Sequence, residues 1–161
     1  MRTVPLGKTG VEVSVFCLGT MDFGTHTDPE TSYKLLDLYV EKGGFFLDTA
    51  NVYARWWPGY VGGESETLLG RWMRERKNRS RLFLATKVGF EMPGVERGLR
   101  AHQIEEECEK SLKRLGIETI DLYYAHRDNP NTPLEETLEA FYRLIKAGKV
   151  RFIGASNYPA W

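Results

Sequence analysis

Three things are scarce in this sequence: cysteine, long hydrophobic runs and an excess of charge of either sign. Cys17 and Cys108 are its two cysteines, and neither has a companion Cys or His at metal-ligand spacing, so we predict two buried free thiols and no disulfide framework or metal site. No apolar stretch approaches the ~18 residues that would span a bilayer, so we expect a cytoplasmic protein without a membrane partner. Lys plus Arg and Asp plus Glu both number 22, which leaves no net field to attract nucleic acid.

Two glycine-rich phosphate-binding patterns are also missing. No G-x-G-x-x-G occurs, although an open nucleotide-binding sheet would be expected to carry it after its first strand. Gly7, Lys8 and Thr9 look like the end of a phosphate loop, but that pattern needs a glycine five residues before Gly7, where the chain has Arg2. The sequence therefore predicts neither of these nucleotide-binding folds.

Short apolar runs alternate with amphipathic segments along the whole chain. With 42% hydrophobic and 27% charged residues, the 161 residues suffice for one ordinary domain, which we place over 1–161. After a small hairpin over 2–16, strands are predicted at 13–18, 45–48, 82–86, 120–125 and 150–155, with helices near 28–43, 63–73, 104–115 and 132–148. Because the strands are short and mostly apolar on both faces, this order indicates an α/β fold with a parallel sheet covered by helices.

Reactive polar side chains stand where predicted strands end. Asp48 ends one apolar run, with Tyr53 five residues further on, and Lys87 and His126 each follow a later run. A carboxylate at the end of a buried strand is expensive to bury unless a cation meets it. In a (β/α)₈ barrel the carboxyl ends of all strands open onto one face, so these side chains and Asn157 would converge there. Taken singly, each has a simpler explanation, such as a cap, a surface charge or a hydrogen-bonded core imidazole.

The order of these motifs resembles the amino-terminal half of an aldo-keto reductase, and the likeness covers the whole chain. The matching residues are Gly19-Thr20-Met21, Asp48-Thr49-Ala50, Tyr53, Thr86-Lys87, His126 and Gly154-Ala155-Ser156-Asn157. The resemblance implies a parallel (β/α) TIM-type barrel, of which this chain holds strands 1–5 behind an amino-terminal hairpin. It also implies an enzyme that binds NADP(H) and reduces aldehydes or ketones, with a catalytic tetrad of Asp48, Tyr53, Lys87 and His126.

The four tetrad residues suit that reaction. Delivery of a hydride to a carbonyl leaves negative charge on oxygen, which calls for a proton donor and a second hydrogen-bond donor, here Tyr53 and His126. A phenol with an ordinary pKa of about 10 is a reluctant acid, and we expect the Lys87 ammonium to lower it. Asp48 would pair with Lys87 and keep it charged.

The resemblance also assigns residues to the cofactor. They are Gly19, Thr20, Met21, Asp48, Ser156 and Asn157, with Ser156 and Asn157 holding the nicotinamide carboxamide and the backbone at 20–21 lining the same pocket. Trp56 and Trp57 are candidates for a wall of the substrate site. A surface loop that packs its own aromatic side chains explains those two tryptophans equally well.

A second function from another class fits parts of the sequence. Residues 96–99 and 130–137 resemble the potassium-channel β-subunit branch of the family, whose members bind the cofactor and serve partly as regulatory binding modules. That branch tends to have Asn where this chain has His126, so the histidine favours turnover of a small carbonyl substrate.

The length of the chain bears on its partners. A complete barrel of the family that this chain resembles is about twice as long. In that family, the groups that bind the cofactor phosphates lie in the second half of the barrel. Five parallel strands alone leave two unpaired edges. We therefore expect self-association or a separate carboxyl-terminal half.

Overall fold

The computed structural model describes residues 1–159 as an α/β fold of seven strands and four α-helices. The elements are β1 (Thr3–Pro5), β2 (Glu12–Ser14), β3 (Leu18–Gly19), α1 (Pro29–Glu41), β4 (Phe46–Asp48), α2 (Glu64–Arg76), a 3₁₀ turn (Arg79–Arg81), β5 (Phe83–Val88), α3 (Ala101–Leu115), β6 (Ile120–Ala125), α4 (Leu134–Lys146) and β7 (Val150–Ala155). None of these helices is both long and apolar enough to cross a membrane. The predicted order of hairpin, strands and helices is confirmed.

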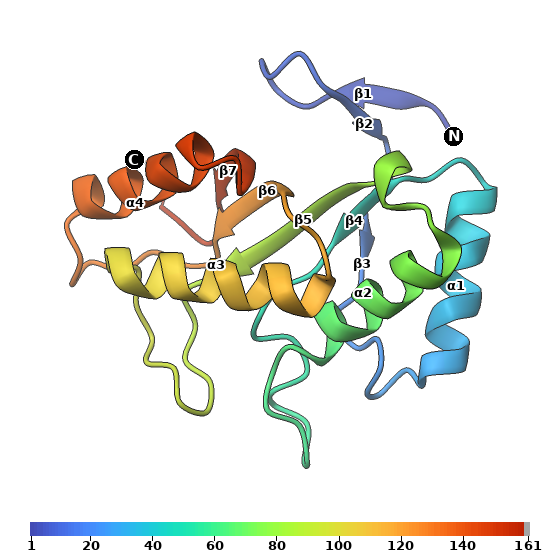
Figure 1. Cartoon of the computed structure of the whole chain (residues 1–161), viewed down its shortest axis with the longest axis horizontal. Coiled ribbons are helices and arrows are strands. Elements are labelled where there is room, and N and C mark those ends of the chain that lie inside the picture. The colour runs from blue at the N-terminus through green and yellow to red at the C-terminus, as the bar shows by residue number, and fades with distance from the viewer. Residues whose placement is uncertain (160–161) are drawn as a thin grey trace.

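Strands β3 to β7 form one parallel sheet in which each strand pairs with the next one in sequence. In its register, Asp48 lies beside Gly19 on one side and Ala85 on the other, and Lys87 lies beside Tyr124. The long loops after β4 and β5 consequently project from the same end of the sheet (Figure 1). Consecutive parallel pairing with a helix in each connection is the arrangement of the first part of a (β/α) barrel, as predicted.

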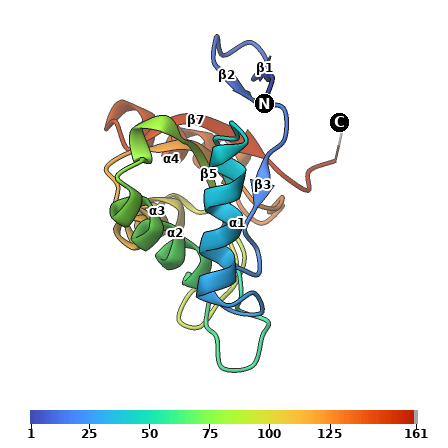
Figure 2. The ribbon, with the colours of Figure 1, turned by 90° about the vertical axis from the view of Figure 1, so that its right-hand side faces the viewer.

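Helices cover one face of this sheet. Figure 2 shows α2, α3 and α4 on one side, while the carboxyl-terminal segment leaves on the other. Leu47 and Leu84 of the strands pack in one cluster with Leu36 of α1 and Trp72 of α2, all fully buried. Asp28 caps α1 by accepting a hydrogen bond from the Thr31 N–H (3.0 Å), as the Asp-Pro start predicted.

The hairpin β1–β2 lies at the amino end of the strands, opposite the long loops (Figures 1 and 2). Val13 of the hairpin packs with Phe83 on the sheet face that carries no helix. Ser14 Oγ shares a hydrogen bond of 2.8 Å with the Tyr39 hydroxyl and accepts another from the Phe46 N–H (3.0 Å). The hairpin thus covers the amino end of the open face and is tied to both α1 and β4.

One predicted strand is wrong in extent, and one thiol is wrong in burial. The run 13–18 is interrupted, since β2 ends at Ser14 and β3 comprises only Leu18 and Gly19. Phe16 is 69% exposed, and Cys17 beside it is exposed as well, whereas Cys108 is buried as predicted. Because β3 is an edge strand of the described sheet, no neighbour covers the apolar side chains that precede it.

Candidate active site

Lys87 joins the predicted tetrad residues at the carboxyl end of the sheet. Its Nζ forms an ion pair with Asp48 and donates hydrogen bonds to the Tyr53 hydroxyl (2.8 Å) and the Thr49 carbonyl oxygen (2.8 Å). An ammonium group has three N–H donors, so all of them are used. Lys87 is only 7% exposed, and such burial of a charge is tolerated because each donor has a partner.

The pairing of β4 with β5 brings these groups together, and the hydrogen bonds between the two segments continue beyond Asp48, the last residue of β4. After β4 the Thr49 N–H donates to Ala85 (2.9 Å) and the Asn51 N–H donates to the carbonyl oxygen of Lys87 (3.2 Å). The segment that leads to Tyr53 therefore stays attached to β5. This attachment explains how residues 34 positions apart in sequence meet with the geometry of a direct hydrogen bond.

The pKa of Tyr53 is raised above its ordinary value, first by burial and then by the negative charge of Asp48. Lys87 is expected to lower the pKa of this phenol, but in the chain by itself the net shift is upward, because desolvation and the carboxylate outweigh any lowering by the ammonium. Tyr53 stays protonated at neutral pH. A protonated phenol is the form that can give a proton away.

Lys87 is subject to two opposed influences. Burial lowers the pKa of its ammonium group, and the Asp48 carboxylate raises it again. Asp48 thus opposes the loss of the Lys87 proton, which is the role predicted for it.

His126 faces the same group of side chains from the end of β6. Its ring centroid lies 5.9 Å from that of Tyr53 with the planes at 74°, and 4.7 Å from that of Phe90. Burial, followed by the charge of Lys87, lowers the pKa of His126 to about 4. The imidazole is consequently neutral at pH 7 and carries one N–H donor.

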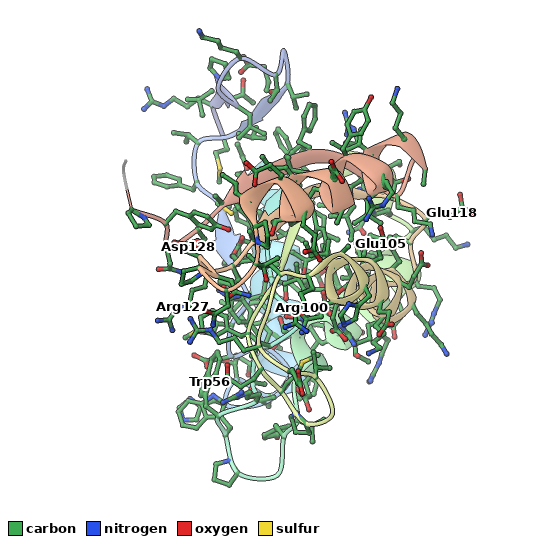
Figure 3. All side chains as sticks on the ribbon, turned by 90° about the vertical axis from the view of Figure 1, so that its left-hand side faces the viewer. Trp56, Arg100, Glu105, Glu118, Arg127 and Asp128 are labelled. Carbon is green, nitrogen blue, oxygen red and sulfur yellow. The ribbon has the colours of Figure 1, made fainter. Side chains whose placement is uncertain are left out.

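A cavity of about 380 Å³ opens above these residues. Its walls are Met21, Val52, Tyr53, Arg55, Trp56, Phe90, Glu91 and His126. Arg55 and Glu91 form an ion pair of 3.1 Å that connects the two long loops at the cavity. Figure 3 shows Trp56 on the same side of the molecule as Arg127, which follows His126, and away from Glu118 beyond the end of α3.

The two candidate substrate residues separate in the structure. Trp56 lines the cavity, and its ring meets that of Tyr53 edge to face at 6.2 Å. Trp57 does not line it: its indole N–H donates to Asp22 (3.1 Å) and its ring stacks on His26 at 4.7 Å. The loop-packing explanation fits Trp57 and the wall explanation fits Trp56.

The residues predicted to bind the cofactor lie at the same carboxyl end of the sheet, but they differ in which of their atoms are exposed there. Thr20 is fully buried: its hydroxyl and its N–H both donate to the Asp48 carbonyl oxygen (3.0 Å each), and its own carbonyl oxygen accepts from the Ser65 hydroxyl (2.7 Å). In this structure Thr20 therefore supports the strand end and presents neither its side chain nor its backbone to a ligand. Met21 is 45% exposed and lines the cavity. Asn157 adopts a left-handed conformation (φ 57°) and its Nδ2 donates to the carbonyl oxygen of His126 (2.9 Å), with Ser156 beside it.

Gly19 contributes empty space. A Cβ built on it would have no atom within 4 Å, so the strand end next to Asp48 is open. Among residues 1–159, no group of three His, Cys, Asp or Glu side chains is placed to hold a metal ion.

Several residues of this region were missed by sequence reasoning. Phe90, Arg55 and Glu91 line the cavity, and two glutamates are buried behind the site. Glu66 of α2 accepts from the Thr86 hydroxyl (2.6 Å) and from Arg114 Nε (2.6 Å), and Glu107 of α3 accepts from Asn51. Hydropathy assigns charged residues to the surface, so nothing in the composition of these helices indicated buried carboxylates.

The chain belongs to the Aldo/keto reductase family, whose model matches residues 15–161. The oxidoreductase YrpG of Bacillus subtilis is 40% identical to it over 168 residues, an alignment that covers 100% of this chain and 51% of that protein. Norsolorinic acid reductase A of Aspergillus parasiticus is 36% identical over 169 residues, covering 96% of this chain and 42% of that one. The chain spans about half the length of the curated relatives it matches.

Solved structures agree with this placement. A thermostable aldo-keto reductase in complex with the inhibitor epalrestat superposes with a TM-score of 0.84 at 33% identity, covering 99% of this chain and 55% of that one. The holo form of an aldo-keto reductase from Bacillus halodurans gives 0.83 at 34% identity, covering 98% and 50%. The five-stranded sheet and its helices are therefore about half of an aldo-keto reductase barrel.

Proposed function

We propose that this chain provides the catalytic half of an NADPH-dependent reductase of aldehydes or ketones. The observation that supports this most directly is the placement of Lys87 between Asp48 and Tyr53, of which Tyr53 lines the cavity. A proton donor, a cation next to it and a neutral imidazole are the groups that carbonyl reduction needs from the protein.

Reduction adds a hydride to the carbonyl carbon and a proton to the carbonyl oxygen, and NADPH supplies the hydride when it is bound. Tyr53 gives its phenolic proton to the oxygen as negative charge develops there. His126 donates its N–H to the same oxygen, and as a neutral group with a pKa of about 4 it adds no charge of its own. Lys87 stabilises the phenolate that Tyr53 becomes, and Asp48 holds Lys87 charged.

The residues at the strand ends fit the nicotinamide end of the cofactor. The open space beside Gly19 would take part of a flat ring next to Asp48. Ser156 and Asn157 bring side-chain hydroxyl and amide groups to the end of β7, which suits recognition of a carboxamide. Preference for NADPH over NADH rests on the family resemblance alone.

The cavity favours an apolar carbonyl compound. Trp56, Phe90, Val52 and Met21 are its apolar lining residues, and Tyr53 and His126 line it as well. We propose a small aldehyde or ketone whose apolar part packs against Trp56. Nothing in this wall offers a fixed charge other than the Arg55–Glu91 pair, whose two charges already compensate each other.

We also propose that the chain needs a partner to close the barrel, either a carboxyl-terminal half or a second copy. β3 and β7 each expose one unpaired edge in the described sheet, and Phe16 and Ile153 are exposed near them. Sedimentation of the isolated chain should give a dimer or larger species. A compact monomer that binds NADPH at micromolar concentration would overturn this part of the proposal.

The test is a fluorescence titration with NADPH followed by an assay of NADPH oxidation with a panel of aldehydes and ketones. It uses this chain beside the same chain extended by any coding sequence that follows it in its gene. Turnover by the extended protein, lost in its Tyr53→Phe variant, supports the reductase. Tight NADPH binding without turnover of any carbonyl would instead indicate a cofactor-binding regulatory module.

A further inference from the structure

The segment that carries Tyr53 has a strained backbone. Ala54, the next residue, has φ 82° although it is not glycine, and it is fully buried. This region is avoided by L-residues because Cβ crowds the neighbouring carbonyl oxygen, so such a conformation persists only where the surroundings enforce it. The contacts that hold this turn therefore fix the position of the Tyr53 phenol.

Asn51 is the attachment point of this turn. Its side chain is fully buried, its backbone N–H donates to the carbonyl oxygen of Lys87 (3.2 Å), and its Nδ2 donates to Glu107 Oε2 (2.9 Å). On the other side the chain passes so close that a Cβ on Gly62 would lie 3.1 Å from the carbonyl oxygen of Asn51. Asn51 is therefore fixed from three directions, two residues before Tyr53.

Glu107 lies outside the cavity yet is costly to keep where it is. Its side chain is 1% exposed, and its second oxygen accepts from Lys110 Nζ (2.7 Å), which lies one turn further along α3. A carboxylate buried to this extent must be compensated by hydrogen bonds and a counter-charge. It belongs to the 15-residue helix α3, whose N-cap is Arg100, so it is anchored to a regular element.

We propose that Glu107 is a positioning residue, which acts through Asn51 to hold Tyr53 against Lys87. The expected effect of Glu107 on catalysis rests on the proposed function, in which Tyr53 is the proton donor. Its expected effect on the order of residues 51–55 is independent of that function. Glu107 is not among the residues that line the cavity, and its hydrogen bond to Asn51 is the contact that connects it to the segment of Tyr53.

Three variants isolate the contact. Glu107→Ala removes the acceptor, Asn51→Ala removes the donor, and Glu107→Gln keeps an acceptor oxygen of the same reach while losing the charge. Leu112→Ala serves as the matched control, because Leu112 lies on the same helix, is 7% exposed and packs in the cluster between α3 and α4. It weakens the helix without touching Asn51.

The readout is amide hydrogen exchange of peptides that cover 50–56, compared with peptides from α4 of the same sample. We expect Glu107→Ala and Asn51→Ala each to speed exchange at 50–56 by at least ~10-fold, with α4 unchanged, and Glu107→Gln to restore protection. The double variant Glu107→Ala/Asn51→Ala should exchange no faster than either single one, because the two side chains make one contact.

Two results would overturn the inference: unchanged exchange at 50–56 in Glu107→Ala, or an equal increase there in Leu112→Ala. Should Glu107→Ala not fold, Asn51→Ala carries the same test, since it leaves the Glu107–Lys110 pair in place. In an active extended protein, Glu107→Ala should lower kcat while NADPH affinity stays constant. If that protein proves inactive, the exchange result still decides the positioning role by itself.

Discussion

The two faces of the sheet differ in what covers them and in how their polar side chains are paired. On the helix side, apolar clusters enclose the strands, and the charged groups there are paired: Glu66 with Arg114 and Glu107 with Lys110. On the open side, side chains converge on a cavity, and Phe16 near the sheet edge is left exposed. Strand alternation connects the two faces, since Thr86 points to Glu66 while the next residue, Lys87, points to Asp48.

This contrast shows that contacts on the helix side of the sheet fix the position of the reactive groups on the open side. Lys87 directly follows Thr86, and Tyr53 comes two residues after Asn51; both Thr86 and Asn51 are buried polar residues hydrogen-bonded to a helix. Stability and chemistry therefore respond to different substitutions. The predictions below separate the two.

The largest effect is expected on the covered side. Glu66→Ala leaves the guanidinium of Arg114, only 22% exposed, and the Thr86 hydroxyl without their acceptor, and should lower the free energy of unfolding by about 3–5 kcal/mol. Urea denaturation measures it. The matched change Glu105→Ala, which breaks a half-exposed pair with Arg143, should cost less than about 1 kcal/mol. Equal losses in both variants would contradict the contrast between the faces.

On the open side the effect should appear in activity. In an extended, active protein, Tyr53→Phe removes the proton donor and should lower kcat/KM by at least ~10²-fold while NADPH affinity stays nearly constant. The free energy of unfolding should also fall, by about 1–3 kcal/mol, because the variant leaves one N–H donor of the buried Lys87 without its acceptor. Steady-state kinetics with a denaturation curve for each protein provide the test, and comparable turnover by the variant would refute the assignment of Tyr53.

A smaller effect concerns pH. His126 has a folded-state pKa lowered to about 4, below its ordinary value of about 6.5, so the fold prefers its neutral form. This stabilisation is present above pH ~6.5 and is lost as pH falls towards 4. Because the ring is partly solvent-exposed, we expect a loss of about 1–2 kcal/mol rather than the full value of the shift. Between pH 6.5 and 4, the free energy of unfolding of His126→Asn should fall less than that of the wild type, as measured by denaturation at several pH values. If the free energies of the two proteins fall in parallel with pH, His126 is not the titrating group.

The smallest effect concerns association through the uncovered edge. Phe16→Asp puts a charge on a 69% exposed aromatic position beside β3 and should weaken self-association about tenfold, the equivalent of ~1.4 kcal/mol. Tyr60→Asp, at a 37% exposed aromatic in the loop after β4, is the control and should leave association unchanged. Sedimentation at several concentrations distinguishes them, and equal association constants for wild type and Phe16→Asp would place the interface elsewhere.

The sequence predicted the strand order and which residues would meet at the strand ends. Apolar runs and helix caps are local signals, and parallel pairing brings Asp48, Lys87 and His126 to one edge whatever the details of packing. It failed at Cys17 and Phe16, since apolar character does not reveal whether a neighbouring element is there to cover a side chain. It also missed Asn51 with Glu107, because a buried contact between residues 56 positions apart leaves no periodic pattern.

The three occupied N–H donors of Lys87 also bear on how the chain would withstand the carbonyl substrates proposed for it. Aldehydes are electrophiles, and an amine with a free lone pair condenses with them to form an imine. Lys87 presents no free lone pair to the cavity, because its nitrogen points at Asp48, Thr49 and Tyr53 and the Asp48 carboxylate opposes the loss of its proton. A carbonyl compound in the cavity would thus lie next to a lysine that cannot trap it, and the first adducts should form on exposed lysines such as Lys8.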